Sequence, residues 1–391
     1  MYARTITAAA LAAGLFVQTQ GFTQVPIRTS PSASTATEAA TRSDPETAAR
    51  DTWRAVLANT PVPGKGCFHV SYPNVAWESV DCKQTKPRAR PVRVHPPAGV
   101  PDGVGNGNDY VADALGLIYY AKGSFIATSG VESVESVGGD GAVDGHNEYT
   151  LQLNTNSSTL ASPAICAGHP GCTVWQQFVY ATDQDTVIPL IDITGGLYIQ
   201  YQLLDWDEKC PSNWQSYSHD GLTDCFRNSS MASLPDIAIT DLGEVSMVAS
   251  ATPGGTDGVT LIAGKEMWSV TADDNVLNIG SVWQQAEFNV VGDGGYSQAV
   301  FNPGASITVR LIVADGSYYA PSCLPPGYAS GYTGETNNLN LGSCQAGLYD
   351  YQYPDIEFTE SLPSLPPAGG HSGGGSLCEG NTTMCKGHSA N

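Results

Sequence analysis

The stretches Val174-Trp-Gln-Gln-Phe-Val-Tyr180 and Leu197-Tyr-Ile-Gln-Tyr-Gln-Leu-Leu204 decide the fold class, because both are strand-like runs rich in aromatic and β-branched residues. Similar short runs recur from residue 106 onward, separated by clusters of Gly, Asn and Asp, and no long helical pattern interrupts them. Many short strands at such spacing are typical of a sandwich or barrel rather than of a βαβ fold. The sequence therefore predicts an all-β protein. The strands are expected at 110–120, 148–154, 174–180, 196–204, 245–250, 258–263, 267–270, 285–291, 298–302 and 305–313.

The segments on either side of this region differ from it in composition. Residues 1–22 join a charged start to an apolar run too short to cross a bilayer, as in a secretory signal peptide. Residues 23–60 are expected to be a Ser/Thr/Pro-rich linker or pro-segment, with one short helix over 46–58. The remaining expected parts are a small disulfide loop with a Pro-rich linker at 61–104, the β-sandwich domain at 105–362, and a Gly-rich low-complexity tail at 363–391.

The charge balance excludes several kinds of partner. The chain has 38 acidic residues against 17 basic ones, for a net charge of −21, so it repels the phosphates of nucleic acids and of anionic membranes. No segment after the signal-like run reaches transmembrane length, so no membrane insertion is expected. We expect a secreted monomer, extracellular or in the cell envelope, without a cofactor. The acidic surface suits either solubility alone or work in acid surroundings.

The ten cysteines form local pairs along the chain, and in an exported protein such pairs predict disulfides between neighbours. A zinc site is the alternative, but the chain has neither C-x-x-C nor histidines at ligand spacing. The expected pairs are Cys67 with Cys82, Cys166 with Cys172, Cys210 with Cys225, Cys323 with Cys344, and Cys378 with Cys385.

Common catalytic and metal-binding motifs are missing from the sequence. H-E-x-x-H, G-x-S-x-G and the P-loop do not occur. The oxygen-rich loop at 140–148 does not have EF-hand spacing, and we interpret it as a solvated hairpin loop. Aromatic residues such as Trp175 and Tyr201 fit either a glycan- or peptide-binding sheet face or a sandwich core.

Three segments taken together resemble one enzyme family. They are Tyr149-Thr-Leu-Gln-Leu-Asn-Thr-Asn156, the paired stretches at 174–206, and Gln285-Ala-Glu-Phe-Asn-Val-Val291. In order and spacing these are similar to the glutamic peptidases, or eqolisins, which are secreted acid endopeptidases. The resemblance implies a concanavalin-A-like antiparallel β-sandwich of jelly-roll type.

The resemblance also implies site residues, because the family uses a Gln and a Glu around an attacking water. The catalytic Gln corresponds to Gln177, and the supporting Asp corresponds to Asn154. Ala286-Glu287-Phe288 match the third motif, but the catalytic Glu position is occupied by Val291, which cannot accept a proton. Glu287 points to the same side as position 291 but lies about 13 Å along the strand from it.

Two functions follow from this pattern. The first is a binding protein that has lost its general base and holds an extended polypeptide or glycan in a cleft formed by Asn154, Trp175, Tyr201, Asn289 and Val291. The second is an acid endopeptidase that uses Gln177 with Glu287 or Asp293. A third class, a cell-surface structural module, is supported only by the low-complexity ends.

Overall fold

The computed structural model describes residues 44–364, except for 59, 86–87, 89–108, 139–140, 142, 159–164, 170–171, 189–190, 220–221 and 326–332. Its helix α1 (Pro45–Ala58) confirms the short helix expected over 46–58. None of the described helices is long and apolar enough to cross a membrane. The expected signal peptide and the Gly-rich tail lie outside the described residues.

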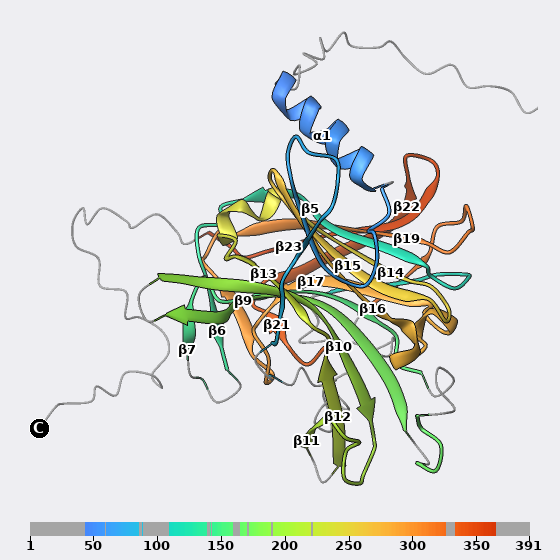
Figure 1. The fold of residues 1–391 in the computed structure, drawn as a ribbon. Coiled ribbons are helices and arrows are strands. Elements are labelled where there is room, and N and C mark those ends of the chain that lie inside the picture. The colour runs from blue at the N-terminus through green and yellow to red at the C-terminus, as the bar shows by residue number, and fades with distance from the viewer. Residues whose placement is uncertain are drawn as a thin grey trace, which may run out of the picture. The chain divides into compact units, whose positions relative to one another are not determined.

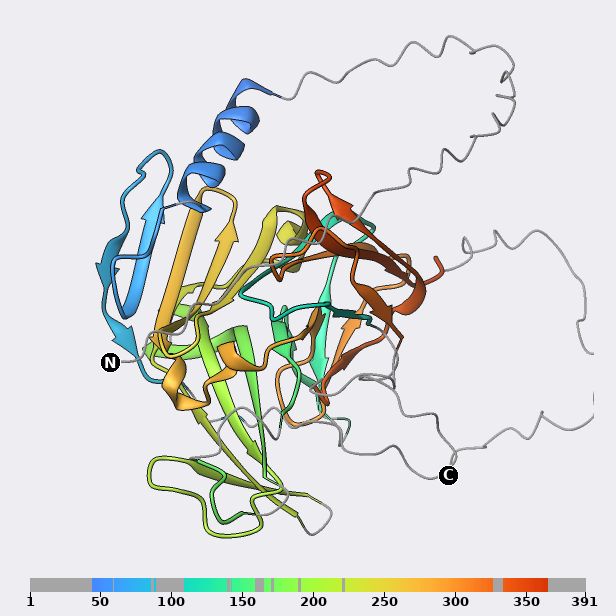
Figure 2. The same cartoon turned by 90° about the vertical axis from the view of Figure 1, so that its right-hand side faces the viewer.

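Two large, mainly antiparallel sheets make up the described fold, which confirms the all-β sandwich (Figures 1 and 2). The first sheet has the order β2 (Glu78–Val80), β1 (Gly66–Ser71), β16 (Glu266–Asp273), β15 (Thr256–Ala263), β14 (Val245–Ala251), β5 (Tyr120–Ser129), β19 (Ser306–Ala314), β23 (Tyr353–Ser361) and β22 (Asn340–Tyr349). The second has the order β11 (Gln215–His219), β12 (Leu222–Asn228), β10 (Ile191–Leu204), β9 (Thr173–Ile188), β8 (Thr150–Thr155), β17 (Gln285–Val291), β4 (Val111–Asp113) and β20 (Ser322–Leu324).

Smaller elements complete the described chain. A third sheet has the order β21 (Thr336–Asn337), β18 (Gln298–Phe301), β6 (Val134–Val137) and β7 (Val143–His146). Its β6 and β7 pair antiparallel, and β7 belongs to the oxygen-rich stretch 140–148. The short helices are η1 (Ile239–Glu244), η2 (Asp274–Val276) and η3 (Ile279–Ser281).

The core lies between the two large sheets, where alternate residues of each strand meet. Phe178 of β9 and Phe288 of β17 are fully buried there, and the Phe288 ring lies 5.2 Å from that of Phe125 on β5. Gly123 of β5 lies directly against Phe288, because a Cβ at that glycine would come within 2.0 Å of the phenylalanine ring. The sandwich therefore depends on a small residue in the first sheet opposite a large one in the second.

The segment 61–104, which we expected to lie outside the sandwich, contributes strands to it. Its β1 pairs with β16 in the first sheet, and β3 (Cys82–Lys83) pairs with β13 (Met231–Pro235), which in turn pairs with β10. The α1 side chains Trp53 and Leu57 pack against the first sheet.

The expected strand at 110–120 is wrong in detail. The chain leaves the second sheet after β4 and enters the first at β5, and an exposed turn around Leu115 makes the connection.

Four of the expected disulfides are present and join loops or strand ends to the sheets. They link Cys67 with Cys82, Cys166 with Cys172, Cys210 with Cys225, and Cys323 with Cys344. The fifth expected pair, Cys378 and Cys385, lies outside the described residues.

Candidate functional site

One face of the second sheet points away from the core and carries polar side chains, and we call it the outer face. Because side chains alternate along a strand, the residues that share this face are two apart. The core takes Leu151, Phe178, Ile199 and Phe288, so the intervening residues belong to the outer face. From β8, β9, β10 and β17 these are Thr150, Gln152, Asn154, Trp175, Gln177, Val179, Tyr198, Gln200, Gln202, Glu287, Asn289 and Val291.

Four glutamines form a continuous hydrogen-bonded row across the outer face, which we call the glutamine row. The Gln177 amide donates to the side-chain oxygen of Gln152 at 2.9 Å and accepts from Gln202 at 2.8 Å. Gln202 also donates to Gln200, which donates to the side-chain oxygen of Asn228 at 2.8 Å. These glutamines are almost fully buried, so the hydrogen bonds hold each amide in one orientation.

A buried group of carboxyls lies beside this row. Glu287 is the ladder partner of Asn154, which is also the partner of Gln177, and the Asn154 amide donates to Glu287 at 3.0 Å. Asp109 precedes β4 and accepts from Asn289 at 3.4 Å. One oxygen of each of Asp109, Asn154 and Glu287 is buried and has no hydrogen-bond partner among the residues that the structure describes. Neighbouring strands thus bring three predicted residues, Gln177, Asn154 and Glu287, into one row.

Burial and mutual repulsion keep these carboxyls protonated to an unusually high pH. Burial raises the pKa of Glu287 well above its ordinary value, and the charge of Asp109 raises it further. Burial also raises the pKa of Asp109 to about 6, although hydrogen bonds from Glu287 and Asn289 oppose the shift. Glu360, which accepts from Asn289 at 2.9 Å, likewise has a raised pKa because it is buried. The site can therefore hold a neutral carboxylic acid beside a carboxylate, which is the arrangement that general acid–base chemistry uses.

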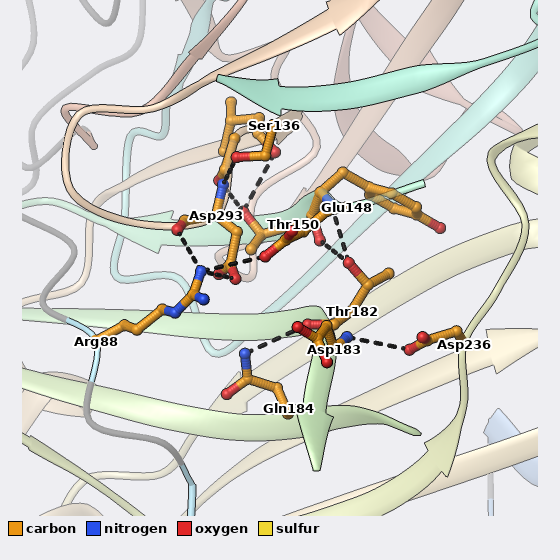
Figure 3. Close-up of polar contacts among 12 residues, drawn as sticks. Arg88, Ser136, Glu148, Thr150, Thr182, Asp183, Gln184, Asp236 and Asp293 are labelled. Carbon is orange, nitrogen blue, oxygen red and sulfur yellow. Dashed lines mark hydrogen bonds and ion pairs between the residues drawn. The ribbon is translucent and has the colours of Figure 1, made fainter. Parts of the chain in front are cut away.

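Two residues from before the second sheet, Thr85 and Arg88, lie against the outer face. The Gln200 amide donates to the main-chain oxygen of Arg88 at 3.0 Å, and Asn228 donates to the Thr85 hydroxyl at 2.7 Å. The Arg88 guanidinium forms ion pairs with Asp293 and Glu148, which Figure 3 shows together with Ser136 and Thr150. Asp293, one of the two alternative predicted carboxylates, is thus paired with a cation instead of facing Gln177.

The other predicted residues divide between the two faces of the sheet. Trp175, Asn289 and Val291 lie on the outer face, and all three are buried. The Trp175 indole donates to the main-chain oxygen of Thr155 at 2.8 Å. Tyr201 lies on the opposite face, in the core, so the structure does not bring it together with the others. Gln177 and Glu287 have Asn154 between them, and the hydrogen bonds of the Gln177 side chain go to other glutamines.

Sequence reasoning missed several residues of this site. Gln200 and Gln202 are two apart on one predicted strand, and Gln152 is two before Asn154 on another, so this period of two was a usable signal. Asp109 and Glu360 had no such signal, because they reach the site from distant parts of the chain. Among the described residues, no group of three or more His, Cys, Asp or Glu is placed to hold a metal ion.

Comparison with known proteins gave one distant structural likeness. No protein-family model and no curated protein matches the sequence. Among solved structures, a crystal structure of scytalidoglutamic peptidase with a peptide-based transition-state analogue aligns over 65% of this chain and 97% of that one. The sequence identity is 12% and the TM-score is 0.25.

Proposed function

We propose that the outer face of the second sheet binds an extended polypeptide. The observation that carries this proposal is the hydrogen bond from Gln200 to the main-chain oxygen of Arg88, because a side-chain amide there binds a peptide carbonyl that belongs to no strand. The contact between Asn228 and Thr85 lies on the same segment. The chain's own residues thus act as a stand-in for a bound polypeptide.

The chemistry of the glutamine row supports this choice of ligand. Each amide offers both a donor and an acceptor, as each peptide unit of an extended chain does. The row is fixed by its own hydrogen bonds, so little side-chain entropy is lost on binding. The ion pairs of Arg88 with Glu148 and Asp293 add a charged contact that would hold one end of the bound polypeptide.

The proposed setting is outside the cytosol. Four disulfides tie the loops of the described domain, and disulfides persist in oxidising compartments. The signal-like residues 1–22 support export.

A competition between tethered and free peptide tests the proposal. The probe is a fluorescent peptide with the sequence of residues 83–93, added to the full chain and to an Arg88→Ala variant. The substitution weakens the tethered competitor, so the free peptide should bind the variant about tenfold more tightly than the wild type. Fluorescence anisotropy measures the two affinities.

The controls separate this face from other surfaces. Adding Gln200→Ala to the Arg88→Ala variant should abolish the gain, whereas adding Arg310→Ala, on β19 of the first sheet, should leave it unchanged. Equal binding by the wild type and the Arg88→Ala variant, or no binding to any folded variant, would overturn the proposal.

An acid endopeptidase is the second candidate, and the row Gln177–Asn154–Glu287 is the observation that favours it. The high pKa of Glu287 leaves a carboxylic acid available beside Asp109. The test incubates folded protein with denatured substrate from about pH 2 to pH 7, beside Gln177→Ala and Glu287→Gln. Cleavage that either substitution removes supports the enzyme, and a lack of cleavage at every pH excludes it.

A further inference from the structure

A hollow lies near the edge of the second sheet, beside the proposed polypeptide site, and Asn228 borders both. It has a volume of about 540 Å³, which is within the usual size of small-molecule sites. Its walls come from β10, β12 and β16 and from the loops beside them. The lining includes Lys65, Gln84, Tyr201, Arg227, Ser230 and Asp273.

The charged group that decides which ligands suit this hollow is the Arg227 guanidinium. It is the ladder partner of Tyr201, and its guanidinium carbon lies 5.6 Å from the centre of the Tyr201 ring and 5.2 Å from that of the Trp214 ring. Two aromatic faces at these distances attract the cation and limit its orientations. The guanidinium is therefore placed in advance on the wall of the hollow.

The Arg227 guanidinium forms no hydrogen bond or ion pair with any residue that the structure describes. The other described arginines, Arg50, Arg54, Arg88 and Arg310, all pair with a carboxylate. An unpaired arginine is unexpected in a chain with 38 acidic residues. Its N–H groups at the edge of the guanidinium plane are left for a ligand.

The neighbouring charges limit what that ligand can be. Asp273 lines the hollow, but it forms an ion pair with Lys65, so one unneutralised positive charge remains on the wall. A guanidinium binds two oxygens of a carboxylate or a phosphate in parallel, but a single positive charge balances a carboxylate and leaves a phosphate dianion half neutralised. The overall negative charge of the protein also disfavours a dianion.

We propose that this hollow binds a sugar acid, a hydroxylated molecule with one carboxylate. Arg227 would bind the carboxylate through two parallel hydrogen bonds. Gln84, Ser230 and Thr271 are neutral polar side chains on the same walls, and they suit the hydroxyl groups of a sugar. The proposed carboxylate-binding group is distinct from the glutamine row, because Arg227 and its ladder partner Tyr201 lie on the opposite face of the second sheet.

Calorimetric titration of the full chain with glucuronate at about pH 6, where a carboxylic acid is ionised, tests the assignment. Glucose has the same ring without the charge, and acetate has the charge without the hydroxyls. Glucuronate should bind more tightly than either. Arg227→Gln should weaken glucuronate binding about tenfold or more while leaving glucose unaffected.

Arg310→Gln is the matched control, because Arg310 also lies over an aromatic ring, that of Tyr349, but is paired with Glu357. It should leave glucuronate binding unchanged. Thermal unfolding checks that both variants are folded. Equal affinity for glucuronate and glucose, tighter binding of phosphate or of a peptide carboxyl terminus, or an Arg227→Gln variant that binds as the wild type does would overturn the proposal.

Discussion

Asp109 and Glu287 are the residues whose chemistry departs most from that of free side chains. Both are buried, they lie beside each other, and one oxygen of each has no hydrogen-bond partner within the described part of the chain. Two such carboxyls cannot both ionise without a large cost, so the site keeps a proton that either acid would lose in water.

Glu287→Gln should therefore flatten the dependence of stability on pH. An amide has the shape of the protonated acid but no charge to bury, so the variant should be more stable than the wild type near pH 7.5 by about 1–2 kcal/mol. Near pH 4 the two proteins should be similar. Urea unfolding at both pH values measures the difference.

The exposed Glu132 provides the control for this substitution. Glu132→Gln should change stability little at either pH, because a solvated carboxylate has no burial cost. If Glu287→Gln instead destabilises the protein most at neutral pH, the carboxylate form of Glu287 is stabilising and the account of this site is wrong.

The contact between β5 and β17 shows how individual strands hold the two sheets together. Phe288 of β17 occupies the space that Gly123 of β5 leaves open, and this contact holds the second sheet against the first where Glu287 lies. A side chain at position 123 would push β17 outward and displace the carboxyl site.

Gly123→Ala should destabilise the protein by about 3 kcal/mol or more, because the added Cβ would overlap a ring that has nowhere to move. Gly64→Ala is the matched control, since no described atom lies within 4 Å of a Cβ at that position. Thermal unfolding compares the two variants. A Gly123→Ala protein as stable as the Gly64→Ala protein would show that the sheets do not pack as described.

The elements also show what a sequence alone can reveal. The β9, β10 and β17 segments were evident from their residue types, and local cysteine spacing predicted the four disulfides that the structure describes. The orientation of Tyr201 could have been inferred, because Gln200 and Gln202 flank it and residues two apart share a face of the strand. The pairing of Glu287 with Asp109 depends on β4 joining β17, a contact between residues far apart in the sequence.

At the scale of the whole molecule, buried carboxylic acids dominate the expected dependence of folding stability on pH. Burial raises the pKa of Asp257 to about 8 and that of Asp109 to about 6, and the pKa values of Glu287 and Glu360 are also raised. Unfolded carboxyls ionise near pH 4. The folded protein therefore binds more protons than the unfolded chain between about pH 4 and pH 8.

Stability should consequently fall as the pH rises through this range. The net charge of −21 acts in the same direction, since self-repulsion increases as carboxyls ionise. We expect a higher melting temperature near pH 4.5 than near pH 8, measured by scanning calorimetry at constant ionic strength. A melting temperature that rises steadily from pH 4.5 to pH 8 would contradict the burial of these acids.

The central claim is that the outer face of the second sheet holds an extended polypeptide, and the position of a bound peptide tests it most directly. The measurement uses the peptide of residues 83–93 with a photoreactive group in place of Ala89, cross-linked to the Arg88→Ala protein and mapped by mass spectrometry. Cross-links are expected on β10 and on the segments around Glu148 and Asp293. Cross-links confined to the first sheet or to α1, or spread evenly over the surface, would contradict it.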